Sequence, residues 1–533
     1  MAGVSDQLDF VPFLSFGVTI HIGENEIMSF NSFQRLPVIQ SVKLKADVNI
    51  KEAILRRKGA KDDDKNTEII KLPNFSKYFL RFKADVNSVY SVEFIDASDL
   101  DNNVSPLQNF GPKLKKRRLE LDRIDDNSSQ SSSIMQSGCQ TSYIFPKKFI
   151  TNNVNINAVG IDLGTTRCCV AVNRKSGIET VAIENESSRL MPSYVSFEEK
   201  NVICGNVVVQ RLRNYAESTV FDCKRIIGRS FSKIVINDYW PFEVLESQNN
   251  AVLKLKINSM EVRKTPEEIA ADLLKNLKQK VEQFQGKCLS EVVITIPATF
   301  TKSQEDATHL AAVLAGWDTV VFLPEPIAAA FAYFIDRPLS NNSTVLLFDL
   351  GGGTLDVCIF EIKDNQIQII SKSGDASLGG RDFDNLLIKH FEYKLKNEHN
   401  VLVTKGKIYT LMLKCQEIKH ALSTVHNSSL DVDDFDPLKN FSIDIARETF
   451  EELAQNVLKQ IHISIMEALN NLNYQPNQIS KILLVGGGSR MPMVKKLLQN
   501  IFPESEQCCE EHPDEVVAIG AAYYAYGIYE RNL

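Results

Sequence analysis

The chain has few of the features that would assign it to a specialised class of protein. Its 533 residues contain no run near the roughly 20 apolar residues that a membrane span needs. The ten cysteines lack zinc-site spacing, and the formal net charge of −7 indicates no surface for nucleic acid or membrane. The first residues lack the basic start and apolar stretch of a secretory signal. We therefore expect a cytoplasmic or nuclear protein with reduced thiols, which contacts neither nucleic acid nor membrane directly.

The N-terminal part of the chain divides into two regions by composition. Residues 1–100 alternate apolar and polar side chains in short stretches such as FGVTIHI and YFLRFKADV, which predicts a small β-rich domain. Residues 101–156 include the serine-rich stretch SSQSSSIMQSGCQTS. Such a composition cannot form a core, so these residues are predicted to be a disordered linker.

The predicted linker contains a basic cluster, in which residues 113–118 read KLKKRR. In an exposed segment this pattern is typical of a nuclear-import signal. A solvated run of charge, balanced by the acidic residues that follow it, explains the cluster equally well. Both interpretations stay open at this point.

Residues 157–533 alternate strand-like and helix-like patterns, which predicts an α/β fold. The strand-like runs are VVITIPA, TVVFLPE, TVLLFDL and KILLVGG. Helical spacing of apolar residues covers 266–284, 383–397 and 450–472.

A turn with the sequence Asp-Leu-Gly occurs twice in this region. The first copy is AVGIDLGTTRCCVAV (158–172) and the second is FDLGGGTLDVCIFEI (348–362). In both, an apolar strand precedes the aspartate, and a second strand resumes eight residues after it. One copy alone would be an ordinary hairpin. Two copies predict two related lobes, lobe I over about 157–340 with a C-terminal helix at 513–533, and lobe II over about 341–512.

These turns have the chemistry of a phosphate and metal site. Glycines let backbone N–H groups approach an anion, and the hydroxyls of Thr165, Thr166 and Thr354 can donate to phosphate oxygens. Asp162 and Asp349 can hold Mg²⁺ through water, because this ion prefers one or two carboxylates together with phosphates. A third turn, Gly486–Gly488 before Pro492, fits beneath a ribose or a phosphate. The chain contains neither a GxxxxGK[ST] nor a GxGxxG motif in these turns.

At these residues the chain resembles the ATPase domain of the 70-kDa heat-shock protein chaperones, from about 159 to about 527. The resemblance rests on motifs in the family's order, including GIDLGTT (160–166), FDCKRIIGR (221–229), FDLGGGTLDV (348–357), GDASLGGRDFDN (374–385) and VGGGSRMP (485–492). It implies a two-lobed, actin-like (ribonuclease H-like) ATPase domain with ATP or ADP and Mg²⁺ between the lobes. Actin and the sugar kinases share this architecture but lack the FDxKRxIGR and LGGxDFDN stretches.

The resemblance also implies roles for individual residues. The residues expected in catalysis are Lys224, Glu325, Asp349, Asp162 and Thr354. The residues expected to bind the nucleotide are Gly164, Thr165, Thr166, Arg167, Gly351, Gly352, Gly353, Gly379, Gly380, Gln416, Lys419, His420, Ser423, Gly486, Gly487, Gly488, Arg490 and Asp514. Asp162 and Asp349 are the expected metal ligands.

Several positions depart from the family pattern. Arg167 replaces a tyrosine, Ile327 a threonine, and Arg381 a glutamate, which reverses a charge at the lobe interface. In the helix that clamps the adenosine, Gln416 replaces a glutamate and His420 an arginine, which is the better flat cation to stack on a base. We therefore expect altered nucleotide affinity and slow hydrolysis.

The family's peptide-binding domain has no counterpart in this sequence, so we expect a truncated member. The expected function is that of an ATP-binding, slowly hydrolysing chaperone-type protein, with co-chaperones and nucleotide-exchange factors as partners. The alternatives are a non-hydrolysing, nucleotide-dependent scaffold or co-chaperone, and an actin-like filament former or small-molecule kinase. FGVTIHIGENE followed by KLKKRR bears a faint resemblance to nucleoplasmin-type histone chaperones, which would make the β-rich domain a binding module for a histone-like protein.

Overall fold

The computed structural model describes the strands between residues 18 and 96, residues 142–146, and residues 153–531 except 185–186, 200, 248, 338 and 509–511. The chain separates into two compact units, Met1–Met135 and Gln136–Leu533. The basic cluster at 113–118 and most of the predicted linker lie outside the described residues, so both predictions about them stay predictions.

The described strands of the first unit form two antiparallel sheets, with the orders β2-β1-β4-β5 and β3-β6-β7. They are β1 (Val18–Ile22), β2 (Asn25–Phe30), β3 (Val38–Lys45), β4 (Glu52–Arg57), β5 (Thr67–Lys71), β6 (Lys77–Ala84) and β7 (Tyr90–Asp96). This backbone agrees with the β-rich region that the alternating sequence predicts.

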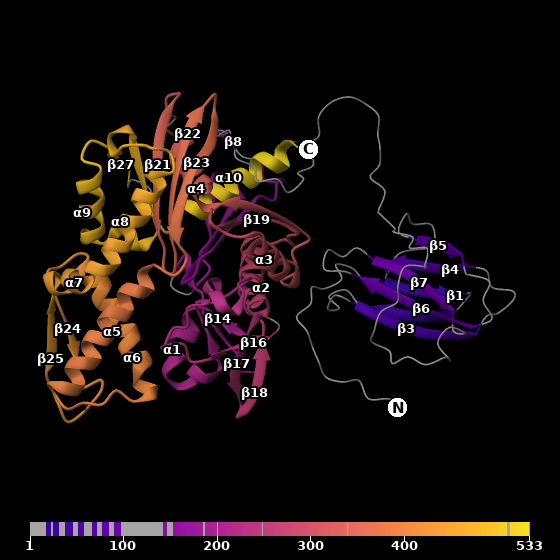
Figure 1. Ribbon diagram of the computed structural model, residues 1–533, viewed down its shortest axis with the longest axis horizontal. Helices are drawn as coiled ribbons and strands as arrows, with labels where there is room; N and C mark the ends of the chain where they lie inside the picture. Colours follow the sequence, from indigo (N-terminus) through magenta and orange to yellow (C-terminus); the bar gives the residue numbers. More distant parts are fainter. Residues whose placement is uncertain are drawn as a thin grey trace. The chain divides into compact units, whose positions relative to one another are not determined.

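The second unit contains two sheets with the same topology (Figure 1). In lobe I the order is β11-β10-β9-β19-β20, with β10 antiparallel to both neighbours and β9, β19 and β20 parallel. In lobe II the order is β27-β26-β21-β22-β23-β8, where β23, β22, β21, β26 and β27 repeat that arrangement. The strands are β8 (Ser142–Ile144), β9 (Val159–Leu163), β10 (Arg167–Arg174), β11 (Gly177–Thr180), β19 (Glu291–Ile296), β20 (Thr319–Pro324), β21 (Ser343–Leu350), β22 (Leu355–Lys363), β23 (Gln366–Asp375), β26 (Lys481–Val485) and β27 (Glu506–Cys508).

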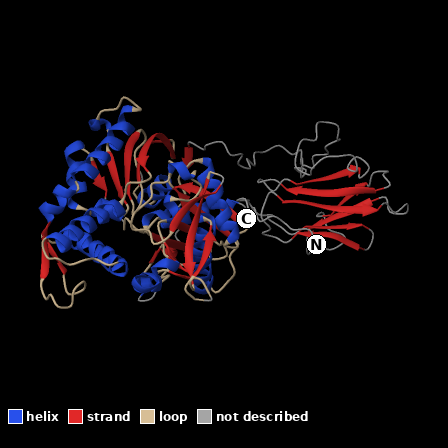
Figure 2. Cartoon of the chain, turned by 60° about the horizontal axis from the view of Figure 1, so that its bottom comes forward, coloured by secondary structure: helices blue, strands red, loops and turns tan. Residues whose placement is uncertain are grey.

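Among the described residues, helices are found only in the second unit (Figure 2). They repeat along the chain, since each half has one helix before its central parallel strand, one after it and one after the last strand. The first set is α2 (Pro266–Gln285), α3 (Lys302–Leu314) and α4 (Glu325–Phe334), and the second is α8 (Gln455–Asn470), α9 (Pro492–Ile501) and α10 (Val516–Arg531). Although α10 follows the last strand of lobe II, it packs against β9, β10 and β19 and so lies in lobe I. The predicted two-lobed α/β fold is therefore confirmed.

Further elements lie between these repeated parts. They are β12 (Leu190–Pro192), β13 (Val195–Ser196), β14 (Ile203–Cys204), α1 (Asn206–Tyr215), β15 (Thr219–Val220), β16 (Glu243–Ser247), β17 (Asn250–Ile257), β18 (Met260–Lys264), α5 (Gly380–Asn397), α6 (Lys405–Leu422), β24 (Asn427–Asp431), β25 (Ser442–Ala446) and α7 (Arg447–Leu453). The short 3-10 turns η4 (Cys223–Arg225) and η7 (Gly487–Arg490) follow β15 and β26.

Two predictions about local structure were wrong in part. The helix expected over 450–472 is two helices, α7 and α8, that meet at Ala454, although Leu458 N–H still donates to the carbonyl of Ala454 at 2.9 Å. The residues of β8 fall in the predicted linker, yet they pair antiparallel with β23. The aromatic side chain of Tyr143 explains this, because it is buried in a hydrophobic cluster.

The sheet of lobe II is buried on both faces, as the continuous apolar run of β21 predicts. Val345 and Leu347 join one hydrophobic cluster, whereas Leu346 and Phe348 join another on the opposite face. The first cluster also contains residues of α4 and α10, so these two helices lie in the seam between the lobes.

The helices of the seam approach each other closely at Gly520. A Cβ atom at this position would lie 1.7 Å from the carbonyl oxygen of Ala328 in α4. The contact between α4 and α10 therefore requires a residue without a side chain.

Among the described residues, no helix has the length and apolar character to cross a membrane.

We predict that Gly520→Ala destabilises the second unit by about 1–3 kcal/mol, because the new methyl group forces α4 and α10 apart. Gly527→Ala is the matched control on the same helix, where a Cβ atom would have its nearest neighbour at 3.9 Å. There the substitution should leave stability unchanged or raise it by about 0.5–1 kcal/mol, since glycine weakens a helix. Thermal unfolding of both variants measures the difference, and equal midpoints would contradict this account of the seam.

Candidate functional site

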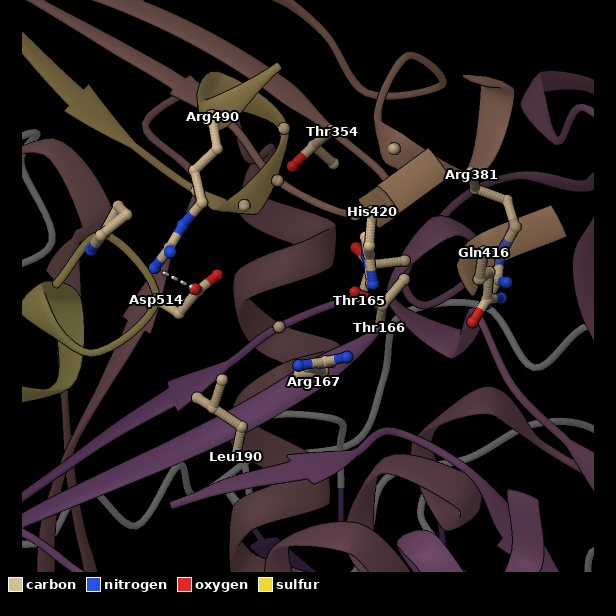
Figure 3. A pocket seen from close by; sticks show the side chains of 18 of the residues that line it. Thr165, Thr166, Arg167, Leu190, Thr354, Arg381, Gln416, His420, Arg490 and Asp514 are labelled. Carbon is tan, nitrogen blue, oxygen red and sulfur yellow. Dashed lines mark hydrogen bonds and ion pairs between the residues drawn. The ribbon is translucent and has the colours of Figure 1, made fainter. Parts of the chain in front are cut away.

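A cleft of about 720 Å³ opens where the two Asp-Leu-Gly hairpins face each other. The β9–β10 turn contributes Gly164, Thr165 and Thr166, and the β21–β22 turn contributes Gly351, Gly352 and Thr354. Figure 3 shows the three threonines between Arg490 on one side and Gln416 on the other. The volume lies within the range of about 300–1,000 Å³ that is usual for small-molecule sites.

The glycines of the second turn make room for the threonines of the first. A Cβ atom at Gly352 would lie 2.0 Å from Oγ1 of Thr166, and one at Gly353 would lie 2.3 Å from Cγ2 of Thr165. The sequence predicts that these glycines leave space for phosphate oxygens. The structure shows that part of this space brings the two turns together, which places hydroxyls from both lobes at one end of the cleft.

The N-terminus of α5 holds the second turn in place. The N–H group of Gly380 donates to the carbonyl of Gly351 at 2.9 Å, and that of Arg381 donates to the carbonyl of Gly352 at 2.8 Å. Asp382 accepts from Gly379 N–H at 2.7 Å and pairs with Arg225 of lobe I at 2.6 Å. Arg225 also donates from Nε to the carbonyl of Gly353 at 3.0 Å. The β21–β22 turn is thus held by the N-terminus of α5 and by Arg225 of lobe I.

Acidic groups crowd the floor of the cleft. Asp349 and Asp356 are direct cross-strand partners in the β21–β22 hairpin, and both are buried. Burial and the nearby charge of Glu325 raise the pKa of Asp162 and of Asp356 to about 7. The same two causes, in the same order, raise the pKa of Asp349 well above its usual value. This arrangement favours a bound cation or proton, because neighbouring carboxylates repel one another.

Lys224 is the ammonium group that balances these acids. Its Nζ atom lies 2.6 Å from Oε1 of Glu325, and both side chains are buried. Burial lowers the pKa of Lys224, but Glu325 and Asp162 more than offset this effect, and the pKa is raised. The lysine therefore stays charged beside the two hairpin turns. Its position follows from η4, whose buried Cys223 donates to the carbonyl of Pro266 in α2 at 3.0 Å.

The other end of the cleft is lined by α6 and by η7. Gln416, Lys419 and His420 come from α6, Ser423 directly follows it, and Lys419 donates to the carbonyl of Gly380 at 3.0 Å. Burial and the charges of Lys419 and Arg167 lower the pKa of His420, so its imidazole is neutral at pH 7. Arg490 of η7 faces this end from the other side of the cleft and pairs with Asp514 at 2.9 Å.

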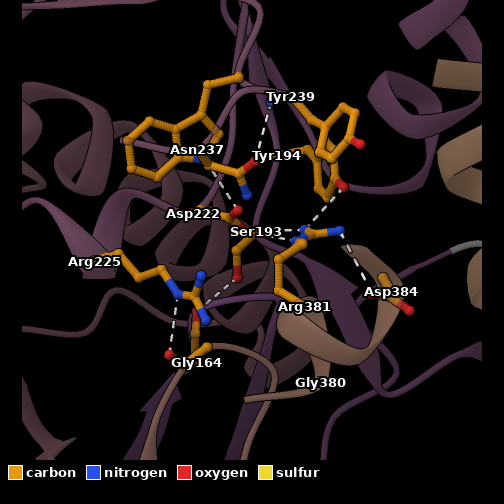
Figure 4. A network of polar contacts seen from close by, with 12 residues as sticks. Gly164, Ser193, Tyr194, Asp222, Arg225, Asn237, Tyr239, Gly380, Arg381 and Asp384 are labelled. Carbon is orange, nitrogen blue, oxygen red and sulfur yellow. Dashed lines mark hydrogen bonds and ion pairs between the residues drawn. The ribbon is translucent and has the colours of Figure 1, made fainter. Parts of the chain in front are cut away.

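Arg381 belongs to a buried polar network that joins the lobes (Figure 4). Its Nε and Nη2 atoms donate to Oδ1 of Asp222 at 3.2 and 2.9 Å, and Nη2 also donates to the hydroxyl of Tyr194 at 3.1 Å. Trp240 Nε1–H donates to the second oxygen of Asp222 at 3.1 Å. Burial lowers the pKa of Arg381, but Asp222 outweighs this effect, and the pKa is raised. The reversed charge that the sequence indicates is therefore neutralised inside the protein.

Of the site residues predicted from the sequence, all but two line this cleft. They are Asp162, Gly164, Thr165, Thr166, Arg167, Lys224, Glu325, Asp349, Gly351, Gly352, Thr354, Gly380, Gln416, Lys419, His420, Ser423, Gly486, Gly487, Gly488, Arg490 and Asp514. Gly353 and Gly379 lie behind the lining, where a Cβ atom at Gly379 would be 2.6 Å from the backbone nitrogen of Gly353.

Sequence reasoning missed Asp356, Asp222 and Tyr194 as parts of the site. A signal for Asp356 was present, because a turn closed between Leu350 and Leu355 places Asp349 and Asp356 opposite each other. Asp222 and Tyr194 lie far from Arg381 in the sequence, and no local pattern joins them. Leu190 and Asp384, which line the cleft together with Tyr194, carried no signal either. Asp222 and Asp356 lie behind that lining.

The donor set fits a metal that keeps most of its water. Within the described parts of the chain, no group of three or more His, Cys, Asp or Glu residues is placed to hold a metal ion. Asp162 and Asp349 instead offer two carboxylates at one end of a cleft that is also lined by hydroxyls. Mg²⁺ is commonly bound in this way, by one or two carboxylates and by the phosphates of its ligand.

Cys168 and Cys169, beside the first turn, are buried free thiols.

We predict that Arg381→Met destabilises the second unit by about 3–5 kcal/mol, because it leaves the carboxylate of Asp222 buried without its partner. Asp222→Asn in the same background should restore part of the loss by removing that charge. Lys256→Met is the control, since Lys256 forms an exposed ion pair with Glu217. Denaturant midpoints test the prediction, and an equal loss in the control would contradict it.

Comparison with known proteins identifies the family. The family model described as "Hsp70 protein" matches residues 158–530. The chain is 35% identical over 373 residues to "Heat shock 70 kDa protein" of Neurospora crassa, covering 69% of this chain and 58% of that protein. It is 35% identical over 379 residues to "Heat shock cognate 70 kDa protein 3" of Dictyostelium discoideum, covering 69% and 60%. The chain thus spans about three fifths of the length of these relatives, and it belongs to the family of 70-kDa heat-shock proteins.

Proposed function

We propose that this chain binds ATP and ADP with Mg²⁺ in the cleft and hydrolyses ATP slowly, as part of a chaperone-type cycle. One observation carries the proposal. Asp162, Asp349 and the Lys224–Glu325 pair meet at the end of the cleft where the two glycine turns also meet. Phosphoryl transfer depends on positioning and on neutralisation of charge, and these side chains are of the types that it needs.

Each residue then has a defined task. Asp162 and Asp349 would hold a hydrated Mg²⁺ ion, which would neutralise charge on the phosphates. The ammonium of Lys224 orients the terminal phosphate and the attacking water, and Glu325 holds that ammonium in place at 2.6 Å. The hydroxyls of Thr165, Thr166 and Thr354 donate to phosphate oxygens, as do N–H groups of the two turns.

The opposite end of the cleft has the groups to hold the nucleoside. Gln416 and Lys419 of α6 can hydrogen-bond a ribose, while His420 and Arg490 present flat groups to the two faces of a base. Because His420 is neutral, it contributes no cation–π attraction, and Arg490 is restrained by Asp514. These features support a weaker hold on the base than an arginine pair would provide.

A second function is supported by the pairing of Lys224. Its ammonium is already held by Glu325, and three ion pairs, Arg225–Asp382, Arg381–Asp222 and Arg490–Asp514, join groups on the two sides of the cleft. A nucleotide could therefore be bound without turnover. The chain would then be a nucleotide-dependent scaffold or co-chaperone rather than an ATPase.

The proposed partners follow from the family. Co-chaperones and nucleotide-exchange factors would act on the two lobes, and the β-rich unit Met1–Met135 would bind a further protein, with a histone-like protein as one candidate. We place this activity in the cytoplasm or the nucleus.

We predict that Lys224→Ala lowers the Mg²⁺-dependent ATPase rate on the order of 10²–10³-fold, because it removes a positioned charge at the phosphates. Asp349→Ala should have a similar effect through loss of the metal. Lys233→Ala, at an exposed position near the same segment, is the control and should keep the wild-type rate. A single-turnover assay measures the chemical step. Binding of ATP without any wild-type turnover would support the scaffold, and wild-type activity equal to that of both variants would exclude the ATPase.

We also predict that binding of Mg²⁺ and ADP weakens as the pH falls below about 7, because Asp162 and Asp356 take up protons in that range. Their pKa is raised above the ordinary value of 3.8, so the free protein holds protons that the metal must displace. Because the pKa values of these two groups are higher in the folded than in the unfolded protein, the free energy of unfolding without ligand declines as the pH rises from about 4 to 7.

Calorimetry in buffers of different ionisation enthalpy measures the protons released on binding. Asp162→Asn should reduce their number near pH 7. Binding without proton release between pH 6 and pH 7 would contradict the prediction.

A further inference from the structure

The short strand β8 is an addition to the repeated plan of the two lobes. Within the described residues, the sheet of lobe I ends at β11 and β12, which both pair with β10, whereas the sheet of lobe II continues past β23, the equivalent of β11, to β8. β8 also lies outside the residues that match the family model, 158–530. We call residues 142–146 the strap, because they contact elements of both lobes.

The strap binds lobe II through its backbone. Ser142, Tyr143 and Ile144 pair antiparallel with Gln368, Ile367 and Gln366 of β23. The N–H group of Phe145 continues the ladder by donating to the carbonyl of Asn365 at 3.2 Å. An unpaired sheet edge is a ready template for an extended segment, and here the chain itself supplies that segment.

The strap binds lobe I through its aromatic side chains. Tyr143 is only 6% exposed and lies edge-on to Tyr524 of α10, with 6.4 Å between the ring centroids. Phe145 contacts Phe331 of α4 at 5.7 Å, and Phe331 stacks on Tyr524 at 5.9 Å. The four rings form a continuous aromatic group across the seam, which we call the ring cluster.

The pattern of burial along the strap fits a strand with one buried face. Tyr143 and Phe145 point toward the seam, whereas Ile144 between them is 50% exposed. Pro146 then lies beside α10, where its Cβ atom is 3.9 Å from the Cβ position at Gly527. The chain contacts α10 again at Asn153, whose N–H group donates to the hydroxyl of Tyr526 at 2.9 Å.

We propose that the edge of β23 and the rings of Phe331 and Tyr524 form a strand-docking site that residues 142–146 fill, and that the docked strap holds the lobes together and slows nucleotide release. The physical reason is that opening the cleft turns the lobes about the seam. The strap is bonded to the sheet of lobe II and buried against the helices of lobe I, so such a turn must break one set of contacts.

The docking of the strap does not depend on any ligand, whereas its effect on nucleotide release rests on the function proposed above. The experiment therefore uses the full chain with one variant, Tyr143→Ser with Phe145→Ser, which removes the buried ring of Tyr143 and the half-buried ring of Phe145. Ile144→Ser is the matched control, because it changes the exposed side chain of the same strand.

Two measurements need no nucleotide. Hydrogen exchange of the segment that contains β23 should speed up in the double variant and not in the control, because the edge loses its partner. The second measurement uses fluorophores on noncanonical amino acids that replace Lys302 of lobe I and Lys405 of lobe II. The distribution of distances between the two fluorophores should broaden toward larger values in the double variant. Unchanged exchange at β23 would overturn the docking, and an unchanged distance would overturn the tie between the lobes.

The third measurement is release of a fluorescent ADP derivative in the presence of Mg²⁺. We expect release about tenfold faster from the double variant, the scale of effect that two lost ring contacts can produce. A synthetic peptide of residues 140–148, added in trans, should bind the empty edge and restore slow release. Equal release from variant and control would overturn the regulatory role. If wild type and variants all fail to bind ADP, the proposed function is wrong instead. The distance between the lobes then decides by itself whether the strap holds them together.

Discussion

The crowding of acidic groups around one ammonium is the constraint on which the site depends. Glu325, Asp349 and Asp356 are buried near Asp162, and Lys224 is the cation that the structure sets among them. Carboxylates this close repel one another unless charge is neutralised. Burial together with this repulsion raises the pKa of Asp162 and Asp356 to about 7 and that of Asp349 well above its usual value. A hydrated divalent cation with its phosphates would relieve that repulsion. The fold thus holds several acidic groups so close together that their repulsion favours binding of a metal–nucleotide complex.

The duplicated architecture explains why the acids converge. Each lobe has a β-hairpin whose first strand is flanked by a parallel strand, and the aspartate stands near the end of that first strand. The two hairpin turns fit together because glycines of one admit threonines of the other. In the seam between the lobes, α4 and α10 meet closely at Gly520. The distance between Asp162 and Asp349 is therefore set by two packing contacts, one between the hairpin turns and one between α4 and α10.

The connections between the lobes decide how this site can work. Arg381–Asp222 and Arg225–Asp382 join the lobes through partly or fully buried groups beside the cleft, and the strap joins them at the seam. Such contacts favour a closed cleft before any ligand arrives, which agrees with a slow enzyme or with a scaffold. In sequence the strap follows the unit Met1–Met135.

The sequence by itself determined the local elements and the chemistry of the cleft. Continuous apolar runs predicted the strands β19, β20, β21 and β26, and the repeated Asp-Leu-Gly turn predicted two lobes with Asp162 and Asp349 facing each other. Such signals are readable because they depend on residues close together in the chain. The tertiary structure alone decided the partners of Arg381, the insertion of Thr166 against Gly352, and the docking of Tyr143 in the seam. Each of these depends on segments far apart in sequence, whose meeting is fixed by packing that no local pattern encodes.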